Sequence, residues 1–150
     1  MMKEQELGPY RVELDQWIAC APFENWLEMT IVAARQGRAE LTMPFRPQMA
    51  NGGSMLHGGA LVSLADTACV MAMKSLVPEN SHFATIQMQV DFLAPVLQGL
   101  VTAQAQVEPQ GDRLWQAKAE LFSHQGQKVM TLSARFKMAR RQPYDTEEQP

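Results

Sequence analysis

The feature that most constrains this chain is a long apolar segment with a helical repeat between residues 58 and 76. Its apolar side chains recur every three or four residues, which predicts an α-helix of about five turns. The intervening positions are also mostly apolar, so the helix is expected to be buried inside the fold. The apolar positions with helical spacing are Leu61, Leu64, Ala65, Ala68, Cys69, Ala72, Met73 and Leu76.

Segments that alternate apolar and polar residues lie on both sides of this helix. Before it, residues 29–33 and 39–45 alternate around Gln36 and Gly37, which predicts a β-hairpin. After it come four more alternating runs, with a glycine between each run and the next. Short connections that contain glycine predict antiparallel neighbours, with one face dry and the other wet. The runs span 85–92, 101–108, 115–121 and 130–136, and the glycines are Gly99, Gly111 and Gly126.

Two further segments complete the pattern. A short helix is predicted over residues 10–21, ending at Pro22, and a loop rich in turn residues is predicted over 46–56. A single antiparallel sheet must cover its apolar face, and the central helix is the one sufficiently apolar element in the sequence. The predicted fold class is therefore α+β, with an antiparallel β-sheet wrapped around a long central α-helix.

Length and composition restrict the class of protein. A chain of 150 residues predicts a single domain over 1–150, because cores usually divide only beyond roughly 250 residues. Two cysteines cannot form a disulfide framework, and the first residues lack an apolar signal segment, so a cytoplasmic location is expected. The net charge of −3 argues against binding to nucleic-acid phosphates. Residues 140–150 have no apolar periodicity and are expected to be disordered.

Several familiar catalytic patterns do not occur. The histidines at 57, 82 and 124 are scattered, and neither HExxH nor CxxC is found, so no metal site is expected. No glycine-rich phosphate-binding motif is found either. Ser54 follows two glycines, but Leu56 stands where Gly-x-Ser-x-Gly needs its last glycine, which disfavours a serine hydrolase.

Asp66 is the most informative single residue. It is the only acidic or basic residue between Gly58 and Met73. Because burying a carboxylate without partners is costly, its position indicates either a functional contact or a raised pKa. In a functional role it would act as a general base or as a nucleophile. The alternative is an exposed position, or an acid satisfied by a neighbour such as Thr67.

The segment Leu56-His57-Gly58-Gly59, where the central helix begins, is the second candidate. The first N–H groups of a helix have no partners within it, and glycine lets a ligand approach them closely. With the helix dipole behind it, the N–H of Gly58 or Gly59 suits the oxyanion that forms from a carbonyl. The alternative is an ordinary loop end at which His57 caps the helix.

The spacing of these two candidates has a further implication. Gly58 and Asp66 are eight residues apart, which places them roughly 12 Å apart along a helix. A reacting carbonyl needs its oxyanion donor and its attacking atom within about 3 Å each. If both act on one substrate, Asp66 must therefore come from a second copy of the chain, with two central helices meeting antiparallel at a two-fold axis.

Asn51, the His57-Gly58-Gly59 segment and Asp66, followed by a strand ending in Asp91-Phe92-Leu93-Ala94-Pro95, resemble the hotdog-fold acyl-CoA thioesterases. The resemblance is strongest to the phenylacetate-degradation thioesterase-like subgroup, and it extends over about residues 22–138. It implies hydrolysis of an acyl-CoA thioester to a carboxylic acid and free CoA. It also implies a homodimer or a dimer of dimers, without metal, cofactor, nucleic-acid or membrane partner.

The resemblance also implies roles for individual residues. Gly58 would polarise the thioester carbonyl through its N–H, and Asp66 of the partner subunit would activate water or attack directly. Asn51 would orient the water or the substrate, and His57 would help to shape the pocket. Thr85 matches a hydroxyl that supports the acid in some relatives. Alternatively, Thr85 is an ordinary threonine on the polar face of the strand, because it occupies the same alternate positions as Gln87 and Gln89.

The substrate would touch further residues of the chain. The acyl group, of medium length or aromatic, is expected to meet Gly59 and apolar side chains of the helix and its neighbours. The 3′,5′-ADP end of CoA is anionic and is expected to meet basic side chains. The apolar candidates are Met55, Leu61, Leu64 and Leu93, and the basic candidates are Arg113, Lys137, Arg140 and Arg141.

Two other functions remain open on the sequence. One is a hydratase or dehydratase, since hotdog folds also host that chemistry on acyl thioesters, although this chain lacks the arrangement around a catalytic His that such families show. The other is an acyl-CoA binding or sensor protein without turnover, although the chain offers no DNA-binding segment or further domain as an output.

Overall fold

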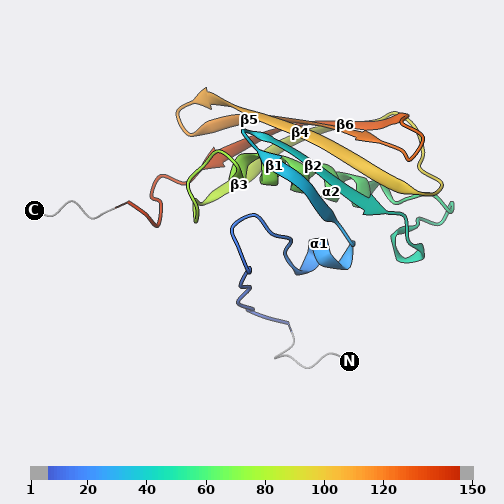
Figure 1. Ribbon diagram of the computed structural model, residues 1–150, viewed down its shortest axis with the longest axis horizontal. Coiled ribbons are helices and arrows are strands. Elements are labelled where there is room, and N and C mark those ends of the chain that lie inside the picture. Colours follow the sequence, from blue (N-terminus) through green and yellow to red (C-terminus); the bar gives the residue numbers. More distant parts are fainter. Residues whose placement is uncertain (1–6, 146–150) are drawn as a thin grey trace, which may run out of the picture.

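The central helix and the sheet around it dominate the computed structural model, which describes residues 7–145 (Figure 1). The helix α2 spans Gly58–Lys74, as the repeat predicted. The sheet has six strands in the order β1-β2-β4-β5-β6-β3, and every neighbouring pair is antiparallel. The strands are β1 Thr30–Arg35, β2 Arg38–Pro44, β3 Phe83–Phe92, β4 Leu100–Gly111, β5 Leu114–Phe122 and β6 Lys128–Met138.

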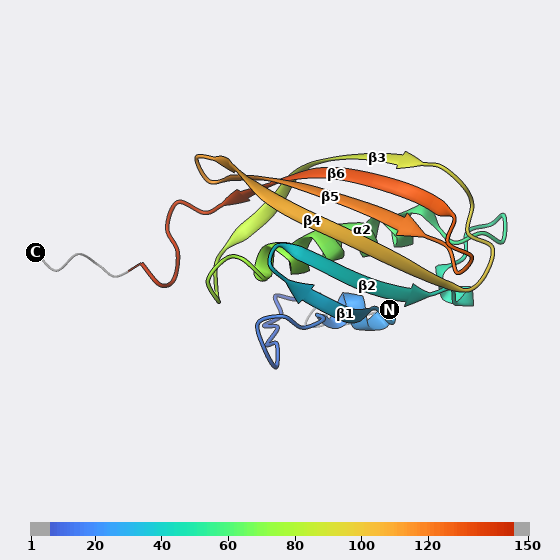
Figure 2. The same cartoon turned by 45° about the horizontal axis from the view of Figure 1, so that its top comes forward.

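The hairpin before α2 is confirmed, because β1 and β2 pair through Arg35 and Arg38 at the turn. The predicted pairing of the first two strands after α2 is wrong. β3 pairs with β6, and β4 pairs with β2 and β5, so residues 93–99 connect strands that do not touch. The N–H groups of Leu93 and Ala94 donate to the carbonyl of Val129, which fixes the chain beside β6 as it leaves β3. Figure 2 shows β3 and β1 at opposite edges of the sheet.

A bulge in β3 decides which of its residues face the helix. Thr85 pairs with the buried Phe136, whereas Gln87 pairs with the exposed Arg135, and the register shifts between them. Residues paired across antiparallel strands lie on the same face of the sheet, so the extra residue Ile86 places Thr85 and Gln87 on opposite faces. The simple alternation that made Thr85 a polar-face candidate is therefore interrupted.

Small residues allow α2 to lie close to the sheet. Leu64, Ala65 and Ala68 of the helix are fully buried, and alanines occupy much of the facing sheet surface. Larger side chains such as Phe136 complete the core. Close packing of this kind is the main source of stability, at about 1.5–3 kcal/mol for each large apolar side chain that is fully buried. The buried sheet alanines are Ala39, Ala103, Ala105, Ala117, Ala119 and Ala134.

The helix expected over residues 10–21 does not form. The segment before residue 22 is irregular, and the short helix α1 spans Pro22–Trp26 instead. Proline suits the first turn of a helix because its missing N–H would have no partner there, so Pro22 starts a helix rather than ending one. Trp17 anchors the irregular segment to the end of α2, since its Nε1–H donates to the Lys74 carbonyl and Lys74 Nζ donates to the Trp17 carbonyl, both at 2.9 Å.

The C-terminal segment, for which disorder is predicted over 140–150, contacts the residues just before β3. Gln142 bridges the N–H and C=O of His82 through its side-chain amide. The hydroxyl of Tyr144 lies 3.0 Å from Ser81 Oγ. Residues 146–150 lie outside the described residues. Within 7–145, no helix is long and apolar enough to cross a membrane.

Candidate active site

The start of α2 leaves one backbone donor free. His57 caps the helix, and its Nδ1 accepts a hydrogen bond from the N–H of Gly59 at 2.8 Å. The next two N–H groups, of Ala60 and Leu61, donate to the His57 carbonyl. The N–H of Gly58 has no hydrogen-bond acceptor within residues 7–145. Of the two glycines considered from the sequence, Gly58 therefore presents the available N–H.

Gly58 is also a position where a side chain would crowd its neighbour Phe92. A Cβ atom there would lie 3.2 Å from the ring of Phe92, which is tighter than an ordinary van der Waals contact. Glycine allows this close approach. The ring of Phe92 covers the side of Gly58 that faces β3.

Asn51 builds the loop that leads to Gly58. Its Oδ1 accepts hydrogen bonds from the N–H groups of Gly53 at 2.9 Å and Met55 at 3.1 Å. Two further hydrogen bonds hold the end of the loop. The N–H of His57 donates to the Met49 carbonyl, and the N–H of Leu56 donates to the Val96 carbonyl. The side-chain NH₂ of Asn51 has no acceptor within the described part of the chain, so it is the group left to meet a water or a substrate.

Asp66 lies on α2 beside β3, where Thr85 Oγ1 donates a hydrogen bond to Asp66 Oδ1 at 2.8 Å. Burial raises the pKa of Asp66 above its ordinary value. The Thr85 hydrogen bond opposes that rise because it favours the charged form, whereas the negative charge of Glu24 adds to it. The partner of the carboxylate is thus Thr85, and not Thr67, which was considered from the sequence.

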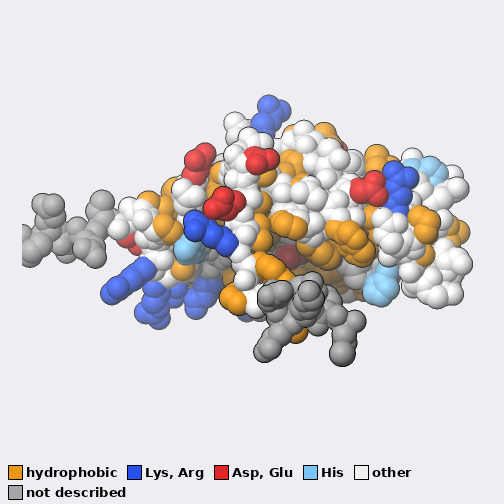
Figure 3. Space-filling model, turned by 90° about the horizontal axis from the view of Figure 1, so that it is seen from below, with side chains coloured by type: hydrophobic (Ala, Val, Ile, Leu, Met, Phe, Trp, Pro, Cys, Tyr) orange, Lys and Arg blue, Asp and Glu red, His pale blue; other side chains and the backbone are white. Residues whose placement is uncertain are grey.

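Gly58 and Asp66 both lie on α2, but they are too far apart to act on the same carbonyl within one chain. Eight residues of regular helix separate them, or roughly 12 Å along the axis. Both contact β3, Gly58 at Phe92 and Asp66 at Thr85. The side of α2 between them is only partly covered in the single chain, because Val62 is half-buried there, and Val70, one turn beyond Asp66, is half-buried too. Figure 3 shows patches of hydrophobic side chains among polar and charged ones on the face seen from below.

The residues expected to meet the substrate are dispersed. Leu61 is only 3% exposed and, like Leu64, belongs to the core, so it does not line an open pocket. Leu93 is exposed just beyond β3, Met55 is half-buried in the Asn51 loop, and Gly59 is exposed at the start of α2. Arg113 lies at the β4–β5 turn, where its Nη1 donates to the Met138 carbonyl at 3.0 Å.

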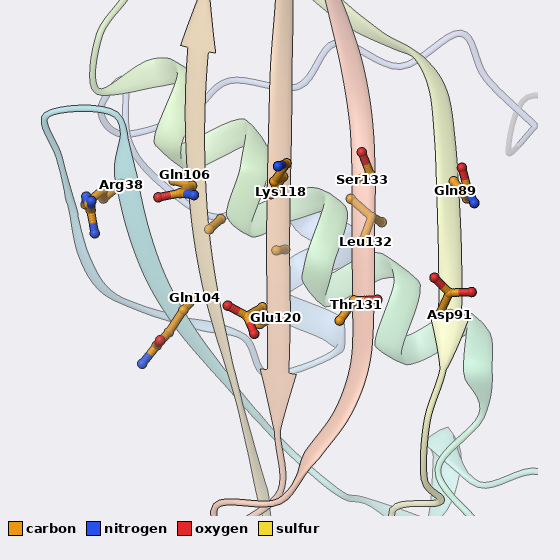
Figure 4. A pocket seen from close by; sticks show the side chains of 12 residues that line it. Arg38, Gln89, Asp91, Gln104, Gln106, Lys118, Glu120, Thr131, Leu132 and Ser133 are labelled. Atoms are coloured by element: carbon orange, nitrogen blue, oxygen red, sulfur yellow. The ribbon is translucent and has the colours of Figure 1, made fainter.

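A hollow of about 440 Å³ lies on the outer face of the sheet and is separate from these groups. Its side chains come from the strands and are mostly polar, including Gln89, Gln104 and Lys118 (Figure 4). The sheet lies between this hollow and α2 (Figure 4). It does not connect with Gly58 or Asp66.

A second hollow, of about 380 Å³, lies beside the start of α2, where His57 and Gly59 line it but Gly58 does not. We call it the α1–α2 pocket, because α1, the turn before Asn51 and the first turns of α2 enclose it. Phe23 and Trp26 of α1 were not anticipated from the sequence, where the helix was expected to end at Pro22. Two aromatic residues three positions apart, just after a proline that can start a helix, were the available signal. Its lining is Phe23, Trp26, Leu27, Gln48, Met49, Ala50, His57, Gly59, Ala60 and Ser63.

Residues 53–130 match the model of a protein family described as the thioesterase superfamily. The acyl-coenzyme A thioesterase PaaI of Escherichia coli K12 is 36% identical over 115 residues, which cover 76% of this chain and 77% of that protein. The solved structure of the E. coli PaaI protein from the phenylacetic acid degradation operon, at 31% identity, matches with a TM-score of 0.72 over 78% of this chain and 83% of that one.

A conserved protein of Pseudomonas aeruginosa, PA5202, has the same fold at 23% identity, with a TM-score of 0.77 over 85% of this chain and all of that chain. These matches confirm the hotdog fold predicted from the sequence.

Proposed function

This chain belongs to the thioesterase superfamily and is a thioester hydrolase, and on that premise we propose that it converts an acyl-CoA thioester to a carboxylic acid and free CoA. The observation that carries the proposal is the pairing of two groups on one edge of α2. One is the free N–H of Gly58, and the other is the half-buried carboxylate of Asp66 held by Thr85. The acyl-CoA thioesterase of E. coli supports CoA as the leaving group.

The carbonyl of the substrate binds at the start of α2. Its oxygen accepts a hydrogen bond from the N–H of Gly58, and the positive end of the helix dipole stabilises the negative charge that develops there. His57 shapes this site by holding the neighbouring N–H of Gly59. The NH₂ of Asn51 orients the water or the thioester beside it.

Asp66 of the partner subunit promotes attack on the carbonyl carbon in one of two ways. As a general base it takes a proton from water, the hydroxide adds to the carbon, and the carbon–sulfur bond breaks to release the CoA thiolate. As a nucleophile it forms an acyl anhydride with loss of the thiolate, and water then cleaves the anhydride. Thr85 positions the carboxylate in both cases.

The uncovered edge of the molecule supports a dimer. β3 is an edge strand, and its apolar side chains Ile86, Met88 and Phe92 are 50%, 39% and 58% exposed. An exposed apolar edge strand is a template for pairing with another chain. A second copy that pairs through β3 about a two-fold axis brings its α2 antiparallel to the first, so that Asp66 of the partner approaches Gly58.

The anionic end of CoA has a candidate site beyond Asp66. Arg113 and Lys137 line a pocket of about 360 Å³ together with His82 and Ile86 of the β3 region. Ile86 is adjacent to Thr85, so this pocket lies at the Asp66 end of the shared site. Arg113 meets the phosphates there through the guanidinium N–H groups that it does not use for Met138.

A CoA-release assay tests the proposal. Wild-type protein incubated with acetyl-, octanoyl- and phenylacetyl-CoA and a thiol reagent is expected to release CoA from at least one of them. Asp66→Asn is expected to lower kcat by about 10²–10⁴-fold, the usual contribution of a general base. Asp91→Asn, which alters an exposed acid on the outer face, is the matched control and should keep wild-type activity. No CoA release by wild type, or full activity of Asp66→Asn, would contradict the proposal.

A further inference from the structure

We propose that Glu24 of α1 is a positioning residue for the reaction, because its carboxylate lies beside Asp66 and its negative charge makes Asp66 a more effective base or nucleophile. This inference rests on the proposed function and deepens it, since Glu24 acts on the substrate only through Asp66.

The chain that leads into α1 runs along α2 and is fixed near both ends of that helix. Trp17 contacts the last turn, where its Nε1–H donates to the Lys74 carbonyl at 2.9 Å. Phe23 lies beside the first turns, where it lines the α1–α2 pocket together with Ser63. The chain between Trp17 and Phe23 can extend over roughly 20 Å, which is enough to follow the roughly 16 Å of α2 between Lys74 and Ser63. In Figure 1, α1 lies below α2, whereas β4 and β5 lie above it.

This path brings Glu24 to the middle of α2. Glu24 follows Phe23 directly, and Asp66 lies one helical turn after Ser63. Both carboxylates are half-buried. Asp66 has Thr85 as its partner, whereas the side chain of Glu24 has no ion pair within residues 7–145. The negative charge of Glu24 is therefore left to act on the groups around it.

The groups that respond to this charge surround Glu24. Burial lowers the pKa of Lys74 and raises that of Cys20, and the charge of Glu24 raises both. For Asp66, burial raises the pKa, the Thr85 hydrogen bond lowers it, and the charge of Glu24 raises it. A like charge disfavours the charged form of a carboxyl group. The effects on all three side chains agree with the path of the chain, which places Glu24 among them.

Other titratable groups near Asp66 do not take over this role. On α2, burial and the charge of Asp66 both raise the pKa of the Cys69 thiol, so this thiol stays neutral while Asp66 titrates. The ammonium of Lys74 is held by Trp17, because its Nζ donates to the Trp17 carbonyl and lies 4.6 Å from the centre of the indole ring. In the proposed dimer, His57 of the partner subunit would also approach, and it is present in every variant compared below.

The two contacts of Asp66 have opposite effects on its chemistry. Thr85 fixes the carboxylate, but its hydrogen bond stabilises the negative charge and so weakens the base. A general base works best when its pKa lies near the pH of the reaction, and the ordinary Asp pKa of about 3.9 is far below neutral pH. Glu24 counteracts the effect of Thr85 without touching the carboxylate that attacks. Thr85 thus sets the position of Asp66, and Glu24 increases its basicity.

The test measures kcat and KM for CoA release against pH. Glu24→Gln is expected to move the acidic limb of kcat/KM to lower pH. Above the limb, kcat should lose only a small part of the about 10²–10⁴-fold that Asp66→Asn loses, with KM unchanged. Glu24→Asp, which keeps the charge, should keep most of the wild-type limb. Glu28→Gln is the matched control, because Glu28 is an exposed acid just after α1 that pairs with Arg46 at 3.1 Å, and its limb should stay in place.

A titration of the Asp66 carboxyl by ¹³C NMR separates this inference from the proposed function. Its signal is identified by its loss in Asp66→Asn, and Glu24→Gln is expected to lower the pKa that it reports. If wild type releases CoA but the limb and the titration are unchanged in Glu24→Gln, the inference is overturned and the proposed function stands. If wild type releases no CoA, the proposed function fails, and an unchanged titration overturns the contact as well. Glu24→Ala gives a second measurement should Glu24→Gln fold poorly, and it must shift the titration in the same direction.

Discussion

At the scale of single residues, the pairing of Asp66 with Thr85 is the central finding. The sequence singled out Asp66 because no other charge accompanies it in the apolar helix, but it left Thr85 open between a support for the acid and a polar-face residue. The bulge at Ile86 turns Thr85 toward α2, where it donates to the carboxylate. A bulge is one extra residue in a strand, and alternation alone does not reveal it.

The Thr85 hydrogen bond makes a prediction about pH. It favours the charged form of Asp66, so its removal in Thr85→Val raises the pKa of that carboxyl further. Because the reaction needs ionised Asp66, the acidic limb of the kcat/KM profile is expected to move to higher pH. Thr67→Val, which removes a neighbouring hydroxyl of α2 that makes no hydrogen bond to Asp66 in the described chain, is the control. A limb that stays in place in Thr85→Val would contradict the assigned contact.

The negative charge of Asp66 is also expected to destabilise the folded state. Its pKa is raised in the folded chain, so the folded state binds the proton more tightly than the unfolded state, and stability falls as pH rises through the folded pKa. Asp66→Asn keeps the shape and the acceptor for Thr85 without the charge. We expect its Tm at pH 7 to exceed that of wild type, and the difference to close below the ordinary Asp pKa of about 3.9. A lower Tm for Asp66→Asn at pH 7 would be the opposite result.

At the scale of elements, the periodic segments were predictable and the connections were not. The helix and the six strands follow from repeats of three to four and of two residues, which reflect how side chains leave a helix or a strand. Pro22 was misread because proline is compatible with both the end and the first turn of a helix. The prediction that β3 and β4 are neighbours was wrong because the glycine between them, Gly99, indicates a turn but does not determine which strands pair.

The contact at Gly99 gives a test of how that connection is held. Gly99 has a φ of +88°, and a Cβ atom there would lie 2.9 Å from the Cβ of His124 in the β5–β6 turn. Gly99→Ala is therefore expected to lower the free energy of unfolding by about 2–4 kcal/mol, from backbone strain and steric overlap together. Urea unfolding measures it.

Gly126→Ala is the matched control for this variant. Gly126 has a φ of +81° but no atom within 4 Å of a Cβ placed there, so it should lose only about 1–2 kcal/mol of backbone strain. An equal loss of unfolding free energy in the two variants would mean that His124 moves aside without cost. The contact between Gly99 and His124 would then contribute nothing to stability.

At the scale of the whole molecule, our proposal makes a single chain an incomplete enzyme. The donor at Gly58 and the carboxylate of Asp66 lie two turns apart on one helix, and the apolar side chains of β3 next to both are exposed. In the proposed dimer, a partner that covers this edge would complete the site and would also shield the apolar surface. A two-fold axis beside β3 would meet both requirements.

Mixed dimers test the sharing of the site directly. One chain carries Asp66→Ala, and the other carries Asn51→Ala and His57→Ala, so each is inactive alone. A heterodimer holds one intact site, and tag-selected heterodimers are expected to regain about half of the wild-type activity. Heterodimers verified by mass that remain inactive would place both halves of the site within one chain.

Local signals in the sequence were enough to predict the helix and the strands and to propose residues for the site. Periodicity fixed the buried helix and the strands, and the lone charge and the glycine pair marked Asp66 and Gly58, since these signals are local in the chain. The three-dimensional contacts were needed to show that Thr85 faces Asp66, that Gly58 rather than Gly59 keeps a free N–H, and that Leu61 belongs to the core. The first and the third depend on contacts between residues distant in sequence, and the second depends on a cap whose local geometry the sequence does not specify.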